Sequence, residues 1–284
     1  MKNMNKFVFP TLVFTIVAVL SIVLAACGSD DGEAAPAAEA EPAAATGPAD
    51  GVYFAQEAEY SERTGWKNVA VFVVENGEVV EVEFNAAHVN GGTDKVTRSR
   101  DGEYGMYGDG PAQWPWYEQA QAVEAYFLDA QDPSADAPDS ISGATISFDY
   151  FFTLAQQALD QGPVGYGPWQ DGAYHAEAEQ FSSSGWKDVV DITVIGGRIV
   201  SANWYAIAED GGTNKKQRSL DGEYGMYGEG PAQWPWWEQA KAAEQHLMET
   251  QDPGAIDADA VSGATIRLGG LASVVNEALA NARR

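Results

Sequence analysis

The chain has little with which to cross-link itself or to hold nucleic acid. Cys27 is the single cysteine among 284 residues, so no disulfide can form within the chain and no cysteine-rich zinc or iron–sulfur site is available. Lysine and arginine together number 16 against 42 aspartates and glutamates, which gives a formal net charge of -26. Because nucleic-acid binding depends on clustered basic side chains, we do not expect that class of partner. Such acidity keeps an exported protein soluble, and it also attracts cationic partners.

Histidine is scarce as well, and its three residues do not occupy matching places in the sequence; they are His88, His175 and His246. A repeated histidine-based metal site is therefore not expected. No G-x-S-x-G nucleophile motif occurs, and no pair of carboxylates stands apart from the many others. We predict no catalytic residue and no metal ligand.

The first 26 residues have the pattern of an export signal. Lys2 and Lys6 precede an uncharged apolar run over residues 7–24, and two alanines then lead to Cys27. This arrangement resembles a lipoprotein signal peptide, which is cleaved before a cysteine that then carries lipid. An uncleaved membrane anchor is the alternative, because the run is nearly long enough to span a bilayer. Both readings place the remaining chain at the outer face of the cytoplasmic membrane.

Residues 28–50 are rich in alanine, glutamate, aspartate and proline, and they contain no aromatic residue. Such a segment buries too little apolar surface to offset the entropy of ordering, so it is predicted to be a disordered tether. The expected organisation has five parts: a signal peptide 1–26, a tether 27–49 that starts with lipid-bearing Cys27, a first domain 50–162, a linker 163–170 and a second domain 171–284.

From residue 50 onward the chain reads as two related copies. The segment Gly-Trp-Lys at residues 65–67 returns at residues 185–187, an offset of 120 that holds for most of the sequence that follows. In each copy, residues typical of strands flank a tight-turn pair, which is Asn76-Gly77 in the first and Gly196-Gly197 in the second. The expected strands are 70–74, 78–84, 189–194 and 198–204. The expected helices are 116–130 and 236–250, each ended by an Asp-Pro pair. We predict an α+β fold in which each copy is an antiparallel sheet with packed helices.

The motif Asp-x-x-Ser-Gly-Ala-Thr closes each copy, at residues 139–145 and 259–265. An apolar run at helical spacing follows each motif, so Thr145 and Thr265 are expected near a helix N-terminus. Unpaired backbone N–H groups and the positive end of a helix dipole meet at such a place, and the glycine lets a bulky ligand approach the backbone. These features favour a phosphate site beside a threonine hydroxyl. The alternative is an ordinary helix cap behind a glycine turn, which two copies in register make the weaker interpretation.

The duplicated motif is similar to the acceptor sequence of FMN-binding domains, in which a flavin transferase esterifies the phosphate of FMN to the final threonine. Such domains occur in the flavin-bearing subunits of sodium-pumping NADH:quinone reductase and of the Rnf complex, and as tandem pairs in lipoproteins of flavin-based extracellular electron transfer. The resemblance covers residues 50–284. It implies two tandem FMN-binding domains with covalent FMN on Thr145 and on Thr265. The other motif residues that it implicates are Asp139, Ser142, Gly143, Ala144, Asp259, Ser262, Gly263 and Ala264.

The second copy departs from the family pattern just after the acceptor. Ser147 is the small hydroxyl residue usual two places after Thr145, whereas Arg267 stands two places after Thr265. The departure makes Thr145 the stronger acceptor of the two, although Arg267 offers a phosphate a positively charged partner.

The most closely matched parts of the two copies, residues 101–120 and 221–240, are rich in aromatic side chains. An isoalloxazine ring is a flat apolar plate, and four residues here offer it flat or soft apolar surfaces: Met106, Trp114, Met226 and Trp234. Core packing explains the aromatic residues equally well.

Core packing is the reading that we favour for Trp66 and Trp186. Sugar rings also stack on exposed tryptophan, so a tandem carbohydrate-binding lipoprotein is a rival from a different class of function.

The family resemblance implies a membrane-anchored electron carrier. Electrons would come from a membrane quinol or NADH dehydrogenase system and go to extracellular acceptors such as ferric iron, free flavins or a partner reductase. Maturation would need a flavin transferase, and the lipid on Cys27 would hold the protein to the membrane. The alternative within this class is the electron-input subunit of a dedicated extracellular reductase.

Overall fold

The computed structural model describes residues 47–106, 112–132, 144–226, 232, 234–257 and 261–284. The predicted signal peptide, Cys27 and all of the predicted tether before residue 47 lie outside these residues. No helix within the described ranges combines the length and the apolar character needed to cross a membrane.

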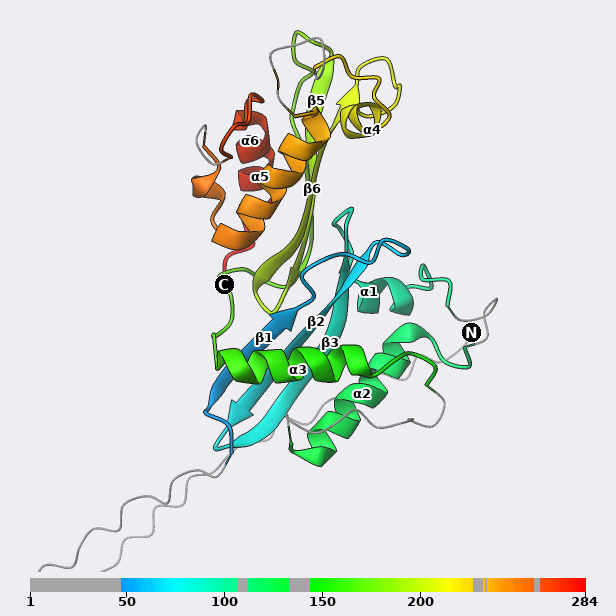
Figure 1. Ribbon diagram of the computed structural model, residues 1–284, viewed down its shortest axis with the longest axis vertical. Helices are drawn as coiled ribbons and strands as arrows, with labels where there is room; N and C mark the ends of the chain where they lie inside the picture. Colours follow the sequence, from blue (N-terminus) through cyan, green and yellow to red (C-terminus); the bar gives the residue numbers. More distant parts are fainter. Residues whose placement is uncertain (1–46, 107–111, 133–143, 227–231, 233, 258–260) are drawn as a thin grey trace, which may run out of the picture. The chain divides into compact units, whose positions relative to one another are not determined.

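The first half of the described chain is α+β. Its three strands form one antiparallel sheet in the order β1-β2-β3, with the bounds β1 Gly51–Gln56, β2 Trp66–Glu75 and β3 Glu78–His88. Three helices follow, with the bounds α1 Lys95–Arg100, α2 Trp116–Ala130 and α3 Asp149–Gln161. Helix α2 packs on β3, and α3 packs on β1 and β2 (Figure 1).

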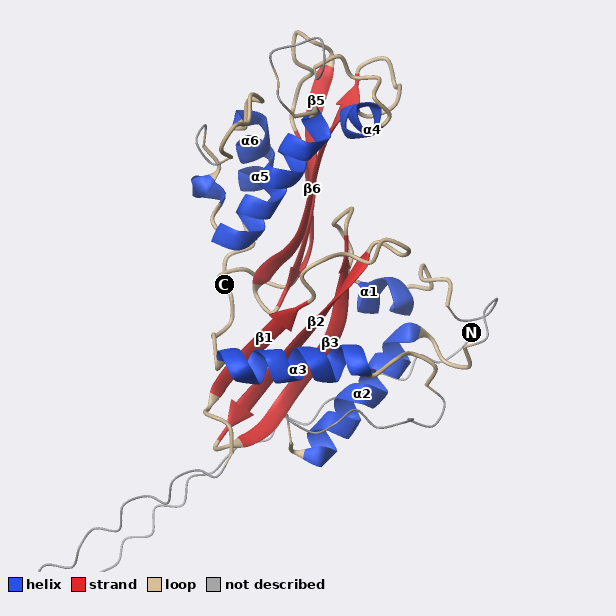
Figure 2. Ribbon diagram, in the orientation of Figure 1, coloured by secondary structure: helices blue, strands red, loops and turns tan. Residues whose placement is uncertain are grey.

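The second half has the same elements in the same order, with one short 3-10 helix added (Figure 2). Its sheet has the order β4-β5-β6, with the bounds β4 Gly172–Glu177, β5 Trp186–Ile195 and β6 Arg198–Ala208. The helices are α4 Lys215–Leu220, α5 Trp236–Thr250, η1 Pro253–Ala255 and α6 Gly269–Ala278. The α+β class is confirmed, and the predicted helices 116–130 and 236–250 coincide with α2 and α5.

The two predicted hairpin turns are confirmed. Asn76 and Gly77 have φ values of 55° and 78°, and Gly196 and Gly197 have values of 61° and 75°. Two consecutive residues with positive φ form the two-residue turn whose twist suits antiparallel strands, and glycine or asparagine adopts it at least cost. The strands extend beyond the predicted bounds, and the sequence reading missed β1, β4 and the six-residue helices α1 and α4.

Each sheet packs its helices over an apolar core. In the first half Phe72 and Phe84 of the sheet meet Phe127 of α2 and Phe151 of α3, and all four are buried. In the second half the core includes residues of β5, β6, α5 and α6, among them Ile192, Trp204, Trp236 and Leu271. The predicted apolar faces of α3 and α6 are therefore the faces that pack against the sheets.

A glutamine follows the last residue of each long helix. Gln131 and Gln251 follow α2 and α5 in the left-handed conformation, with φ values of 52° and 57°. The Gln131 side chain accepts from Val79 N at 2.8 Å and donates to Val79 O at 2.9 Å, and Gln251 does the same with Ile199. Each amide thus occupies the hydrogen-bonding groups of a sheet edge, so the helix ends one residue before the Asp-Pro pair.

The segment predicted as a linker is packed against the rest of the chain. Val164 N donates to Val52 O at 2.8 Å, and Trp169, which is 2% exposed, donates through its backbone N to Gly197 O at 3.0 Å. A further apolar cluster contains Val71 of β2 together with Ile195 of β5. Residues of the predicted linker therefore make backbone hydrogen bonds to β1 and to the turn between β5 and β6.

Candidate functional site

Thr145 and Thr265 occupy equivalent exposed turns before the last helix of each half. Thr145 precedes Asp149, the first residue of α3, by four positions, and Thr265 precedes Gly269 of α6 by the same number. Both threonines are exposed to solvent. The expectation of a nearby helix N-terminus is confirmed, since a helix begins four residues after each threonine.

A buried glutamine from the preceding long helix accepts hydrogen bonds from the backbone of each turn. Gln119 of α2 is 0% exposed, and its Oε1 accepts from Thr145 N at 2.6 Å and from Ile146 N at 3.0 Å. Gln239 of α5 is also 0% exposed and accepts from Thr265 N at 2.7 Å and from the next backbone N–H at 3.2 Å. The hydroxyl oxygens lie 3.3 Å and 3.5 Å from the same glutamine oxygens.

Four backbone donors near the first acceptor have partners within the protein. The N–H groups of Thr145 and Ile146 donate to Gln119, and those of Phe151 and Phe152 donate to Phe148 O inside the first turn of α3. These four groups are therefore not available to a phosphate. The Thr145 hydroxyl lies on a turn that Gln119 holds through two backbone hydrogen bonds.

The same glutamines connect the acceptor turns to the predicted aromatic and sulfur residues. Gln119 Nε2 donates to Trp114 O at 2.8 Å and lies 3.6 Å from the sulfur of Met106. Gln239 Nε2 makes the corresponding contacts, with Trp234 O at 2.8 Å and with the sulfur of Met226 at 3.9 Å. In each half, one buried amide thus brings together the predicted threonine, tryptophan and methionine.

Gly263 shows why the motif needs glycine. Its φ of 81° lies in the left-handed region, and a methyl group placed there would lie 3.9 Å from Cη2 of Trp234. Trp234 is 38% exposed and lies next to Gly263. Ser262, Gly263 and Thr265 are exposed as well, whereas Ala264 is partly buried.

Part of the predicted motif cannot be placed. Asp139, Ser142 and Gly143 in the first half, and Asp259 in the second, lie outside the described residues. After the acceptors, Ser147 Oγ donates to the Asp149 carboxylate at 3.0 Å, whereas Arg267 is exposed.

Three aromatic rings surround a lysine in each half. The Lys95 ammonium lies 4.6 Å from the ring centre of Trp116, 4.9 Å from that of Tyr104 and 5.5 Å from that of Trp66. Lys215 is placed in the same way, at 5.1 Å from Trp236, 5.0 Å from Tyr224 and 5.8 Å from Trp186. Trp116 and Trp236 are buried in the cores, and Trp66 is 7% exposed while Trp186 is partly buried. These aromatic faces are occupied by the protein itself.

The short helices α1 and α4 put the lysines in place. Asp94 caps α1 by accepting from Thr97 N at 3.0 Å, and Asn214 caps α4 by accepting from Gln217 N at 2.9 Å. Lys95 is 9% exposed, and its burial lowers the pKa of its ammonium to about 8, while the Glu57 carboxylate acts in the opposite direction.

The sequence reading missed Gln119, Gln239 and the two caged lysines. A signal for the glutamines was present, because Gln119 lies three residues after Trp116 and four before Val123, on the buried face of the helix. A polar residue in a buried register, repeated in both copies, indicates a structural or functional contact.

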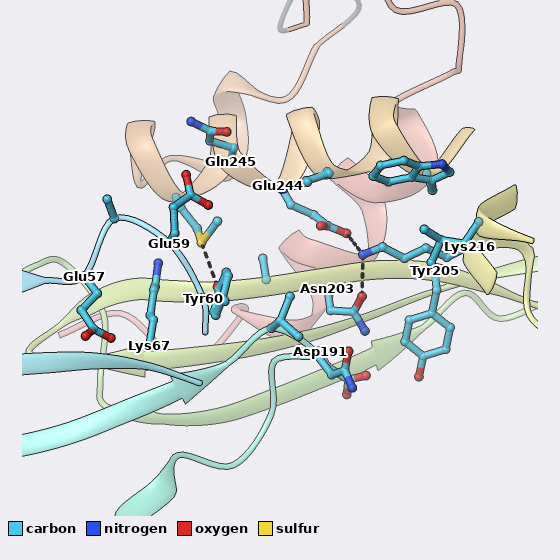
Figure 3. A pocket seen from close by; sticks show the side chains of 18 of the residues that line it. Glu57, Glu59, Tyr60, Lys67, Asp191, Asn203, Tyr205, Lys216, Glu244 and Gln245 are labelled. Atoms are coloured by element: carbon cyan, nitrogen blue, oxygen red, sulfur yellow. Dashed lines mark hydrogen bonds and ion pairs between the residues drawn. The ribbon is translucent and has the colours of Figure 1, made fainter. Parts of the chain in front are cut away.

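A cavity of about 1030 Å³ lies elsewhere, and no residue of the two acceptor clusters is among the described residues that line it. In its wall, Lys216 Nζ lies 2.7 Å from both Asn203 Oδ1 and Glu244 Oε1, and the Tyr60 hydroxyl points toward the sulfur of Met248 (Figure 3). Acids outnumber lysines among its lining residues. No group of three or more metal-binding side chains gathers within the ranges that the structure covers.

Comparison with known proteins gives relatives but no assigned activity. No family model and no curated protein matches the chain. A Clostridium thermocellum protein solved by solution NMR is 44% identical, over 39% of this chain and 90% of that chain, with a TM-score of 0.31. A Clostridium perfringens protein solved by crystallography is 25% identical, over 40% of this chain and 88% of that one, with a TM-score of 0.32.

Proposed function

We propose that this protein is a membrane-anchored, extracytoplasmic flavoprotein made of two tandem FMN-binding domains. Each domain carries FMN through a phosphoester on a threonine, Thr145 in the first and Thr265 in the second. The protein works as an electron carrier, and its own residues supply attachment, orientation and electrostatic environment.

The observation that supports this proposal most strongly is the duplicated contact between a buried glutamine and an acceptor turn. An exposed hydroxyl whose backbone is fixed by a 0% exposed side chain suits a covalent attachment point, because the attached group inherits a defined position. The neighbouring tryptophan and methionine offer apolar surface of the kind that a flavin ring contacts. The residues present therefore fit the group.

When bound, FMN supplies reversible transfer of one or two electrons. A flavin transferase forms the bond between the threonine oxygen and the FMN phosphate. Electrons enter from a membrane quinol or NADH dehydrogenase system and leave to extracellular ferric iron, free flavins or a partner reductase. Lipid on Cys27 keeps the carrier at the outer face of the cytoplasmic membrane, within reach of its donor. A role as the electron-input subunit of an extracellular reductase uses the same two sites.

The test is direct detection of the bond. The protein, made together with a flavin transferase, should fluoresce in a denaturing gel, and peptide mass should place FMN less one water on Thr145 and Thr265. Thr145→Ala should remove the first modification alone, and the double variant with Thr265→Ala should remove both. Thr153→Ala, at an exposed threonine of α3 outside the motif, is the matched control and should change neither.

Protein isolated from its native membrane with both threonines bare would contradict the proposal. The carbohydrate-binding rival would then return, with Trp234 as its exposed stacking residue. Burial of Trp116 and Trp236 removes two of the surfaces that such a rival would need.

A further inference from the structure

The caged lysines carry charges that the surrounding residues leave unpaired. Lys95 and Lys215 face three aromatic rings each, and among the described residues neither ammonium has a carboxylate oxygen within ion-pair distance, since the lysine ion pairs there are made by Lys187 and Lys216. Aromatic faces stabilise an ammonium without cancelling its charge. The positive charge therefore remains effective toward neighbouring groups.

Each cage lies beside an acceptor turn. Trp116 touches Lys95 and stands three residues before Gln119 on α2, so the two side chains lie on one face of the helix, one turn apart. Gln119 contacts Thr145 and also Met106, whose backbone N donates to Tyr104 O, and Tyr104 is another wall of the cage. A short series of neighbouring residues thus connects the Lys95 ammonium with the acceptor turn.

The same path exists in the second half, through Trp236, Gln239 and Thr265 for the helix and through Tyr224 and Met226 for the loop. Its duplication argues against a chance arrangement, because the two halves differ at many other positions.

A charge in an apolar surround acts more strongly than the same charge in water, since the effective dielectric constant is lower. Reduction brings electrons to the carried group from a donor such as a quinol, which is oxidised to the quinone and releases its protons. If fewer protons than electrons are taken up, the reduced group is more negative than the oxidised group. A nearby positive charge that is not neutralised stabilises the reduced form and raises its reduction potential.

We propose that Lys95 and Lys215 are tuning residues that raise the reduction potential of the groups carried on Thr145 and Thr265, each by holding an unneutralised ammonium in its aromatic cage. The inference rests on the proposed function, and it adds which residues of the chain set the driving force for electron transfer.

The two halves contain a natural variation of this device. Burial raises the pKa of the Asp188 carboxyl, and the hydrogen bond from Trp204 and the Lys215 ammonium act in the opposite direction, so the carboxylate and the ammonium attract each other. Asp188 also accepts from Trp204 Nε1 at 3.0 Å, so its carboxylate is held in place. The equivalent position in the first half is Asn68, which carries no charge. Removing the Asp188 charge should therefore strengthen the effect of Lys215.

The experiment measures midpoint potentials at neutral pH in proteins with one acceptor each. In the Thr265→Ala background, Lys95→Met should lower the midpoint potential of the first site. We expect the redox equilibrium constant to change at least tenfold, which corresponds to about 59 mV for one electron. Lys95→Arg keeps the charge and should leave the potential near that of the parent. In the Thr145→Ala background, Asp188→Asn should raise the potential of the second site.

Several outcomes separate the possibilities. A parent protein without bound flavin would refute the proposed function rather than the role of the lysines. Full flavin content with an unchanged potential in Lys95→Met would overturn the tuning role. If Lys95→Met fails to fold by circular dichroism, Asp188→Asn decides, because the potential of the second site must rise in that variant.

A second readout needs no flavin and uses the protein lacking both acceptor threonines. In that protein Lys95 should titrate near its lowered pKa by NMR, and an ordinary lysine titration would contradict the cage.

Discussion

Gln119 Oε1 lies 2.6 Å from the backbone nitrogen of Thr145, so a side chain of the long helix α2 fixes the turn that carries the acceptor hydroxyl. The equivalent pair, Gln239 and Thr265, is joined at 2.7 Å. A fully buried amide that satisfies two backbone donors and one backbone acceptor costs free energy to remove, because its partners lose their hydrogen bonds inside the protein.

The first prediction follows from this contact. Gln119→Leu keeps the volume but leaves Thr145 N, Ile146 N and Trp114 O without the partner they have now. We expect a loss of about 2 kcal/mol in the free energy of unfolding and at least a tenfold slower flavin attachment at Thr145. Peptide mass measured over time on one sample provides the check, because Thr265 serves as the internal control. Equal rates at both threonines would show that the glutamine has no part in placing the acceptor.

Much of the secondary structure could be predicted from local patterns. The hairpin turns at Asn76-Gly77 and Gly196-Gly197 follow from residues that accept positive φ, and α2 and α5 follow from apolar spacing with a stop after residues 130 and 250. These features depend on neighbours within a few residues, which is why the sequence was sufficient for them.

The site was only partly predictable, because its contacts join residues far apart in the chain. Gln119 reaches a turn 26 residues away, and the cage around Lys95 draws Trp66, Tyr104 and Trp116 from three separate elements. No local pattern encodes such distances. The contacts at the helix ends could not be predicted for a similar reason, since Gln131 bonds to Val79 on the sheet edge, 52 residues earlier in the chain.

The second prediction concerns the edge of the first sheet. Gln131→Ala removes two hydrogen bonds to Val79 and places alanine at a φ of 52°, so we expect a loss of about 2 kcal/mol in the free energy of unfolding. Gln131→Gly removes the same bonds but accepts the backbone conformation, and it should lose less. Urea unfolding of the two variants separates the contributions. If alanine and glycine cost the same, the backbone conformation is not strained.

The third prediction is a pH dependence of stability centred on Glu83. Burial, the largest cause, raises the pKa of the Glu83 carboxyl from 4.5 to about 7, and the carboxylates of Asp94 and Glu124 add to the rise. The folded protein therefore binds more protons than the unfolded chain between these two values. This group's contribution to stability is highest at the acidic end of that window and falls as the pH rises through about 7.

The second half provides the matched substitution, because Asn203 stands at the position of Glu83 and binds Lys216. Glu83→Asn should stabilise the protein by about 2 kcal/mol above neutral pH and much less at mildly acidic pH. Urea unfolding across the pH range measures the difference. A gain that is the same at every pH would mean that Glu83 titrates normally in the folded protein.

The fourth prediction tests the glycine of the motif. Gly263 has a φ of 81°, a conformation that costs alanine about 1 to 2 kcal/mol, so Gly263→Ala should destabilise the turn through its backbone, while the added methyl group would make only ordinary contact with Trp234. Because Thr265 follows two residues later, the turn should populate the attachment geometry less often, and flavin incorporation at Thr265 should fall severalfold. A methyl group added at Gly269, the start of α6, would meet no neighbouring atom within 4 Å, so Gly269→Ala is the matched control and should leave incorporation unchanged. Equal incorporation in both variants would mean that the left-handed conformation of Gly263 is not required for Thr265 to accept its group.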